Sequence, residues 1–156
     1  MKYSLLISTL LFSFFGCNLL TDSSETFTAT NKTVINDGIE YSLDIPTNVY
    51  SLYDTLSISF KVKNISVSIK QLNFSNMQQL SFELIDVNNN ISIFYPFIVS
   101  PATSRITLLP NETKELNMVS FFKDNNGNFI NNGKYILSVF LANNNSPKLN
   151  LDISVN

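Results

Sequence analysis

Residues that carry catalytic chemistry are scarce in this sequence, and each shortage excludes a class of function. The 156 residues include no histidine, and Cys17 is the sole cysteine. Without histidine a chain cannot build Ser-His-Asp or Cys-His catalysis, and one cysteine supports neither an internal disulfide nor a His/Cys zinc site. We therefore expect a protein that is not an enzyme and that holds no cofactor and no metal.

Charged residues are also few. They make up 14% of the chain, and the net charge is −2. A nucleic-acid-binding surface needs clustered Lys and Arg, which this composition does not supply. We expect no nucleic-acid partner, a monomer, and one domain with short additions.

The N-terminus has the layout of a secretory signal. Lys2 precedes an apolar run from Ser4 to Phe15, which Gly16 and Cys17 follow. A cysteine directly after a small residue resembles a bacterial lipobox, in which the thiol is acylated and becomes the new N-terminus. The resemblance implies a signal peptide over residues 1–16, a lipid anchor at Cys17, and a place in the bacterial cell envelope facing outside the cytoplasm.

Two other interpretations of the N-terminus stay open. Residues 3–20 carry no charge and are marginally long enough for an uncut membrane anchor, and ordinary secretion is the third alternative. All three place the domain outside the cytoplasm, because Lys2 should stay inside. Residues 17–37 are rich in Thr and Ser, so we expect a flexible tether there, with the folded domain over residues 38–156.

The rest of the chain alternates apolar and polar residues with period two. Leu80, Phe82 and Leu84 alternate with Ser81 and Glu83, which predicts a strand with one buried face. Similar patterns recur between turn signals, and we expect about eight or nine short strands, with starts near Ile39, Leu56, Val67, Leu80, Ile91, Ile106, Leu116, Tyr135 and Leu149. This spacing predicts an all-β fold with two antiparallel layers, and its length suffices for a core without disulfides.

Several acidic and aromatic groups invite functional interpretations. The segment Asp124–Asn128 is rich in oxygen ligands, but its glycine stands too early for an EF-hand loop and no glutamate follows, so we expect a solvated hairpin loop. Glu83 and Asp86 lie three apart on a strand, should point to opposite faces, and are expected to be solvated. Glu112 and Glu115 lie around a turn.

Aromatic residues could form an exposed binding patch. Most should be buried, because burying each one stabilises the fold by roughly 1.5–3 kcal/mol. The pattern does not assign Phe97 and Phe129 to the core. The candidates for the patch are Phe94, Tyr95, Phe97, Phe121, Phe122 and Phe129.

From Tyr50 to Leu141 the motifs resemble those of the BsuPI-type intracellular proteinase inhibitor domain. The motif "Y-x-x-x-D-x-L" and a strand ending in Asn are matched by Tyr50, Asp54, Leu56 and Asn64. A Phe, a Gln-bearing corner and "F-x-hydrophobic-x-D" are matched by Phe74, Gln78, Phe82, Leu84 and Asp86. The turn "L-x-P-x-E-T" is matched by Leu108, Pro110, Glu112 and Thr113, and "G-x-Y-x-L" by Gly133, Tyr135 and Leu137.

The resemblance implies an immunoglobulin-like sandwich, and two alternative functions stay open for a chain without catalytic residues. One is a binding module that inhibits an extracytoplasmic protease. The other is a structural or adhesive lipoprotein without a protease partner. For the inhibitor, the segment from Pro96 to Pro101 is the favoured contact, ahead of Lys123–Gly133 and the Ser75–Gln79 corner, because prolines reduce the entropy lost on binding. The contact residues would be Phe97, Ile98 and Val99.

Overall fold

A computed structural model describes residues 30–89, 92–96, 100–143 and 145–156 of the chain. The predictions for the signal peptide, for Cys17, for the first part of the tether and for Phe97, Ile98 and Val99 lie outside these ranges. In the described part, no helix combines the length and apolar character that crossing a membrane requires.

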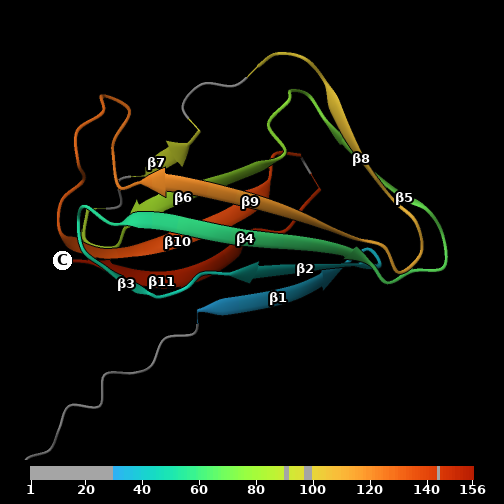
Figure 1. Ribbon diagram of the computed structural model, residues 1–156, viewed down its shortest axis with the longest axis horizontal. Coiled ribbons are helices and arrows are strands. Elements are labelled where there is room, and N and C mark those ends of the chain that lie inside the picture. The colour runs from blue at the N-terminus through green and yellow to red at the C-terminus, as the bar shows by residue number, and fades with distance from the viewer. Residues whose placement is uncertain (1–29, 90–91, 97–99, 144) are drawn as a thin grey trace, which may run out of the picture.

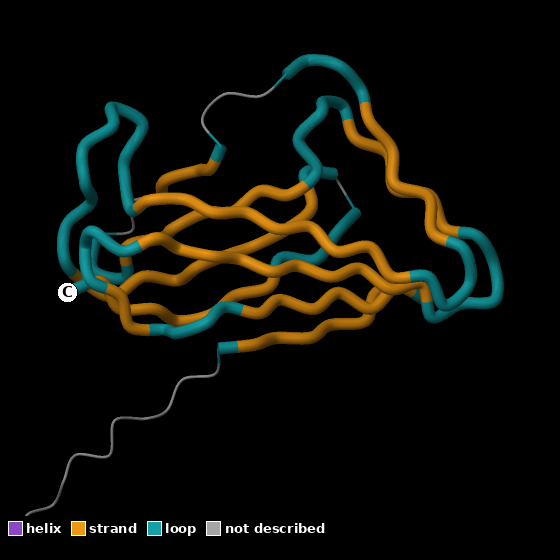
Figure 2. Tube along the Cα trace, in the orientation of Figure 1, coloured by secondary structure: helices purple, strands orange, loops and turns teal. Residues whose placement is uncertain are grey.

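The described chain is all-β, as the period-two pattern predicts, and forms an immunoglobulin-like sandwich (Figure 1, Figure 2). The strands are β1 (Asn31–Asn36), β2 (Ile39–Asp44), β3 (Val49–Tyr50), β4 (Thr55–Asn64), β5 (Lys70–Phe74), β6 (Leu80–Asp86), β7 (Ser92–Tyr95), β8 (Ser104–Leu108), β9 (Thr113–Phe121), β10 (Gly133–Leu141) and β11 (Leu149–Val155). There are eleven, against about eight or nine expected, because the sequence pattern misses β1 and β3.

Two sheets form the layers of the sandwich. The first has the strand order β1-β2-β4-β9 and is antiparallel throughout. The second has the order β3-β11-β10-β6-β7, and only the short pair β3–β11 is parallel. A two-stranded ribbon, β5-β8, extends the molecule at the right-hand end of Figure 1.

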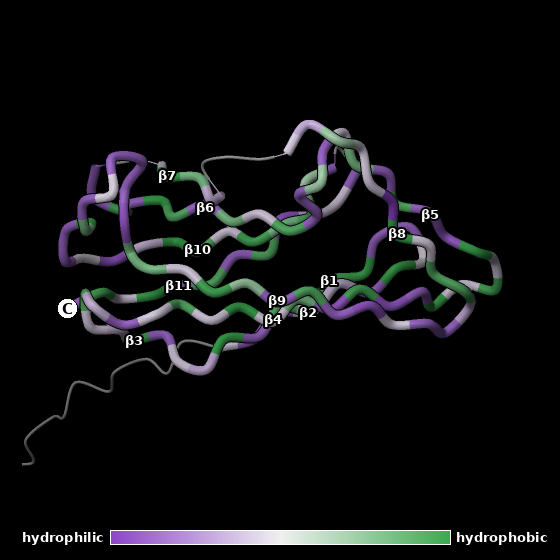
Figure 3. Tube along the Cα trace, turned by 45° about the horizontal axis from the view of Figure 1, so that its top comes forward, coloured by the Kyte–Doolittle hydropathy of each residue, from purple (hydrophilic) through white to green (hydrophobic). Residues whose placement is uncertain are grey.

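The apolar residues of both sheets meet in one core. On β4, Leu56, Ile58, Phe60 and Val62 are buried, while the serines and lysines between them are exposed or half-buried. The colours in Figure 3 alternate along the strands for this reason. Each buried side chain removes apolar area from water on the shared face, so the alternation fixes which face of the strand points inward.

The prediction that the tether reaches Asp37 is wrong for β1. Residues 31–36 pair with β2 in antiparallel register, and a two-residue turn connects the strands. Asp37 and Gly38 both have positive φ, 48° and 70°, as a tight hairpin turn of this kind requires. Every residue of β1 is exposed or half-buried, so the strand has no apolar alternation, and the Asp-Gly pair was the signal that could have revealed it.

β9 is an edge strand and is therefore only partly buried. Leu116, Met118 and Ser120 face the interior side, but each is only half-buried, unlike Ile58 and Phe60 on the neighbouring β4. Phe122, expected to continue the alternation, lies beyond the end of the strand and is completely buried.

Candidate functional site

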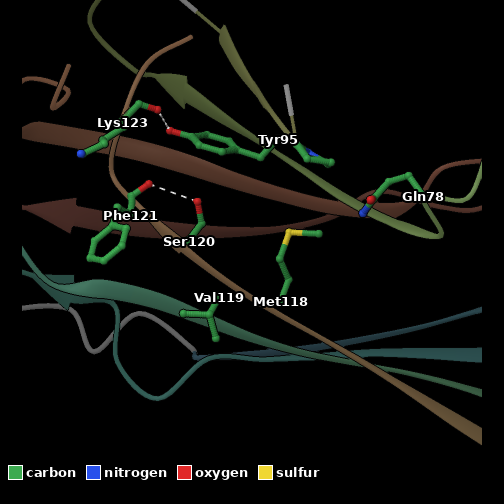
Figure 4. A pocket seen from close by; sticks show the side chains of 8 residues that line it. Gln78, Tyr95, Met118, Val119, Ser120, Phe121 and Lys123 are labelled. Carbon is green, nitrogen blue, oxygen red and sulfur yellow. Dashed lines mark hydrogen bonds between the residues drawn. The ribbon is translucent and has the colours of Figure 1, made fainter. Parts of the chain in front are cut away.

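The open side of the sandwich carries a groove of about 340 Å³ between the edge strands of the two sheets. β9 forms one wall of the groove. The end of β7 and Gln78, in the corner before β6, form the other wall (Figure 4). The lining residues are Gln78, Tyr95, Pro96, Met118, Val119, Ser120, Phe121 and Lys123.

Side chains from both faces of β9 line this groove. Met118 pairs with Ile58 and belongs to the interior face, whereas Val119 pairs with Ser57 and belongs to the outer face. Successive side chains of a strand point to opposite faces. A groove that touches both sets must run along the edge of β9, where its backbone groups are.

Tyr95 fixes the opposite wall. Its ring stacks on Phe82 with centroids 4.3 Å apart and an interplanar angle of 11°, and its hydroxyl donates a hydrogen bond to the Lys123 carbonyl. Burial raises the pKa of Tyr95 to about 12, although the hydrogen bond to Lys123 opposes part of that increase. The hydroxyl therefore stays protonated at physiological pH and remains a donor.

An exposed aromatic cluster, Tyr53, Phe121 and Phe129 with Lys123 among them, continues the groove at one end. Tyr53 and Phe129 meet edge to face at 4.9 Å, and the Lys123 ammonium lies 4.8 Å from the Phe129 ring and 5.9 Å from the Phe121 ring. The exposed fractions are 73% for Tyr53, 52% for Phe121 and 39% for Phe129. Apolar rings that stay in water beside a groove suit contact with a partner.

The aromatic patch predicted from the sequence is therefore only partly in this place. Phe121 and Phe129 belong to the aromatic cluster, and Tyr95 lines the groove, but Phe122 is core. Phe94 is exposed on the outer face of the second sheet, where it meets Phe140 edge to face at 6.5 Å.

Sequence reasoning missed Tyr53, Met118 and Val119. The signal for the last two was available, because residues 116, 118, 119 and 121 are all apolar and give one strand apolar side chains on both faces. Tyr53 lies in a bend without periodicity, and no pattern marked it.

The loop from Lys123 to Gly133 supports the aromatic cluster. The Asp124 carboxylate accepts hydrogen bonds from the backbone N–H groups of Asn126 and Asn128, both at 2.9 Å. These bonds, led by the one from Asn128, lower the pKa of Asp124. Asp124 thus closes its own turn, as expected of a hairpin loop, and no cluster of three or more His, Cys, Asp or Glu that could hold a metal occurs in the described residues.

The prediction that Glu83 is solvated is wrong. Only 7% of the residue is exposed, and its carboxylate accepts hydrogen bonds from Ser92 Oγ and from Lys148 Nζ, the latter at 3.0 Å. Lys148 Nζ also lies 4.7 Å from the centroid of the Phe140 ring. Asp86 lies apart from this pair and caps its own turn by accepting the Asn88 N–H at 2.8 Å, and that bond lowers its pKa.

The loops and turns that the sequence singled out have different outcomes. Gln78 donates a side-chain hydrogen bond to the Leu80 carbonyl, as expected of the glutamine corner. Glu112 accepts the Leu109 N–H at 2.7 Å and closes the turn before β9, while Glu115 accepts a hydrogen bond from Ser59 across the sheet. Of the favoured contact loop, Pro96 lines the groove, but Phe97, Ile98 and Val99 are outside the described residues, so that placement stays a prediction.

A second exposed apolar surface lies at the opposite end of the molecule. This apolar tip consists of Ile65, Val67, Ile69 and Leu109, and Val67 is 98% exposed. Asn64, fully buried, holds the loop beneath it: its amide donates to the carbonyls of Ser68 and Leu108 and accepts from the N–H and hydroxyl of Ser66. The loop thus directs polar groups toward Asn64 and leaves its apolar side chains in water.

Comparison with known proteins gives a fold and no family. No protein-family model and no curated protein matches the chain. A domain of an alkylpurine DNA glycosylase of Pseudomonas fluorescens is similar, with 9% identity, a TM-score of 0.54, and coverage of 78% of this chain and 31% of that chain. This likeness concerns the fold alone.

Two other solved structures align over a similar share of this chain. A β-glucosidase from Erythrobacter marinus has 14% identity and a TM-score of 0.49, and the alignment covers 80% of this chain and 16% of the glucosidase. The CARDB domain of a Pyrococcus furiosus protein has 13% identity and a TM-score of 0.41, and the alignment covers 80% of this chain and 95% of the CARDB chain. This chain thus spans a small part of the glycosidase and of the glycosylase.

Proposed function

We propose that this protein is a non-catalytic binding module that holds another protein at the open side of its sandwich. The observation that carries the proposal is the groove along β9 together with the exposed aromatic cluster at its end. Apolar surface that remains in water on a rigid scaffold is the usual mark of a contact surface. Tyrosine and phenylalanine supply large contact areas at low cost in side-chain entropy.

The location belongs to the same proposal. The apolar N-terminal run ending in Gly16-Cys17 supports export and a lipid anchor at Cys17. The domain would then face outside the cytoplasm, attached to the cell envelope through residues before β1. A surface-displayed module can reach its partner while the anchor keeps both near the membrane.

The resemblance to BsuPI-type inhibitors makes an extracytoplasmic serine protease the first partner to test. Full-length protein in detergent would be titrated into a serine protease that cleaves a chromogenic peptide. We expect saturable inhibition, which Val119→Asp should weaken because a charge on the groove wall must be desolvated on contact. Val67→Asp is the matched control, since it makes the same change on the apolar tip.

A structural or adhesive lipoprotein is the second candidate, and the apolar tip favours it. Ile65, Val67 and Ile69 stay exposed there on a loop to which Asn64 is hydrogen-bonded, and Leu109 lies exposed beside them. On this alternative the proteases are unaffected at any concentration. The protein would then attach to other envelope material through the tip, and Val67→Asp would be the variant that loses attachment.

A further inference from the structure

β9 is the longest of the edge strands in the two sheets. The strand is nine residues long, and among the described residues it pairs with β4 alone. It contains no proline. Exposed strand edges of this length usually carry protection, because their free N–H and C=O groups can pair with another chain.

The other sheet edges have protection that residues 118–121 of β9 lack, although Lys114 and Glu115 place charges near the start of that strand. β7 has only four residues, and Pro96 follows it directly. β1 is mostly polar and carries Lys32. Residues 118–121 of β9 are therefore the stretch of sheet edge best suited to pair with another chain.

We propose that β9 accepts an extended segment of a partner protein as a further strand of the first sheet, with an acidic side chain of that segment against Lys123. This inference rests on the proposed function, and it names the chemistry of the partner. The first sheet is antiparallel throughout, so the added strand would run antiparallel to β9 and begin near Phe121.

The walls of the groove fit the side chains of such a strand. Alternate residues of the added strand would point to the outer face, toward Val119 and Phe121, or to the interior face, toward Met118 and Tyr95. Both sets of contacts are largely apolar. The segment should therefore be apolar on both faces and should gain its affinity from main-chain hydrogen bonds as well as from these contacts.

Lys123 supplies the charge preference. In the described part of the chain the ion pairs are Lys70–Asp37 and Lys148–Glu83, so no carboxylate neutralises Lys123. The neighbouring Asp124 carboxylate is turned into its own loop by the N–H groups of Asn126 and Asn128. The Phe121 and Phe129 rings hold the ammonium beside the groove, and an acidic residue at the start of the added strand would complete the pair.

Selection with a displayed library of random linear nine-residue peptides tests this inference on the full-length protein in detergent. We expect the selected peptides to be apolar at most positions and to carry Asp or Glu near the N-terminus. N-methylation of the peptide backbone, one position at a time, should weaken binding about tenfold at every second residue and little at the others, because only alternate N–H groups face β9.

Variants of the protein complete the test. Lys123→Gln should weaken binding of the acidic peptides about tenfold. Lys123→Arg should retain it, and Lys32→Gln, on the opposite edge, should change nothing.

The outcomes separate the two levels of the proposal. If Val119→Asp abolishes binding but the N-methyl scan shows no alternation, or Lys123→Gln has no effect, strand addition is overturned and the binding module stands. If no peptide is selected, or if Val67→Asp weakens binding and Val119→Asp does not, the proposed site falls together with the inference.

Discussion

Replacing Asn64 with alanine should destabilise the domain more than any other single change at the apolar tip. The side chain is fully buried and takes part in four hydrogen bonds, at 2.7 Å and 3.0 Å to the Ser68 and Leu108 carbonyls and at 3.0 Å and 2.7 Å from the Ser66 N–H and hydroxyl. Alanine removes all four and leaves the buried Leu108 carbonyl without this partner.

Net contributions of about 1 kcal/mol per hydrogen bond, with some recovery by water at the half-buried Ser66 and the exposed Ser68, give a loss of about 3 kcal/mol. For a domain of this size the loss corresponds to a fall in melting temperature of about 10 °C. Urea unfolding followed by circular dichroism, on a chain that begins at Thr30, measures it. Asn117→Ala, at an exposed position on β9, is the control and should cost less than about 0.5 kcal/mol. A loss below 1 kcal/mol for Asn64→Ala would refute the role given to this residue.

Three other predictions concern the anchor, the groove wall and the buried carboxylate. Cys17→Ser should release the protein from membranes, as fractionation would detect; an unchanged integral membrane protein of unchanged mass would favour the uncut anchor. Because burial raises the pKa of Tyr95 to about 12, stability should be complete below pH 10 and fall as the pH rises from 10 to 12, and Tyr95→Phe should reduce that slope in urea titrations. Lys148→Met should lower the free energy of unfolding by about 1–2 kcal/mol, because it leaves the buried Glu83 carboxylate without its cation. The loss is moderate because Lys148 itself is half exposed. Adding Glu83→Gln should recover part of this stability.

Strands such as β6, whose buried apolar residues alternate regularly, could be predicted from the sequence. β1, which has no buried face, could not. Leu80, Phe82 and Leu84 alternate because their side chains enter the core, so β6 begins and ends where the pattern predicts. β1 buries none of its side chains completely and is held mainly by its backbone pairing with β2, and such pairing leaves no mark on side-chain type. Asn64 could be recognised as the end of a strand, but one of its four hydrogen bonds is made to Leu108, which lies far along the chain.

For the same reason, only part of the candidate site could be predicted from the sequence. Phe129 stood out because no pattern assigned it to the core, and it is in fact exposed. Glu83 was misjudged because its partners, Ser92 and Lys148, come from different strands and loops and meet only after folding. The groove along β9 depends on which strand ends at the edge of a sheet, and that is a property of topology rather than of local sequence.

Amide hydrogen exchange of the full-length protein, with and without a saturating selected nine-residue peptide, tests the central claim most directly. Our account predicts slower exchange at alternate amides of β9, because only these face the added strand, and no change in β1 at the other edge of the sheet. Slowing confined to the apolar tip around residues 64–69, or no slowing in β9, would contradict it.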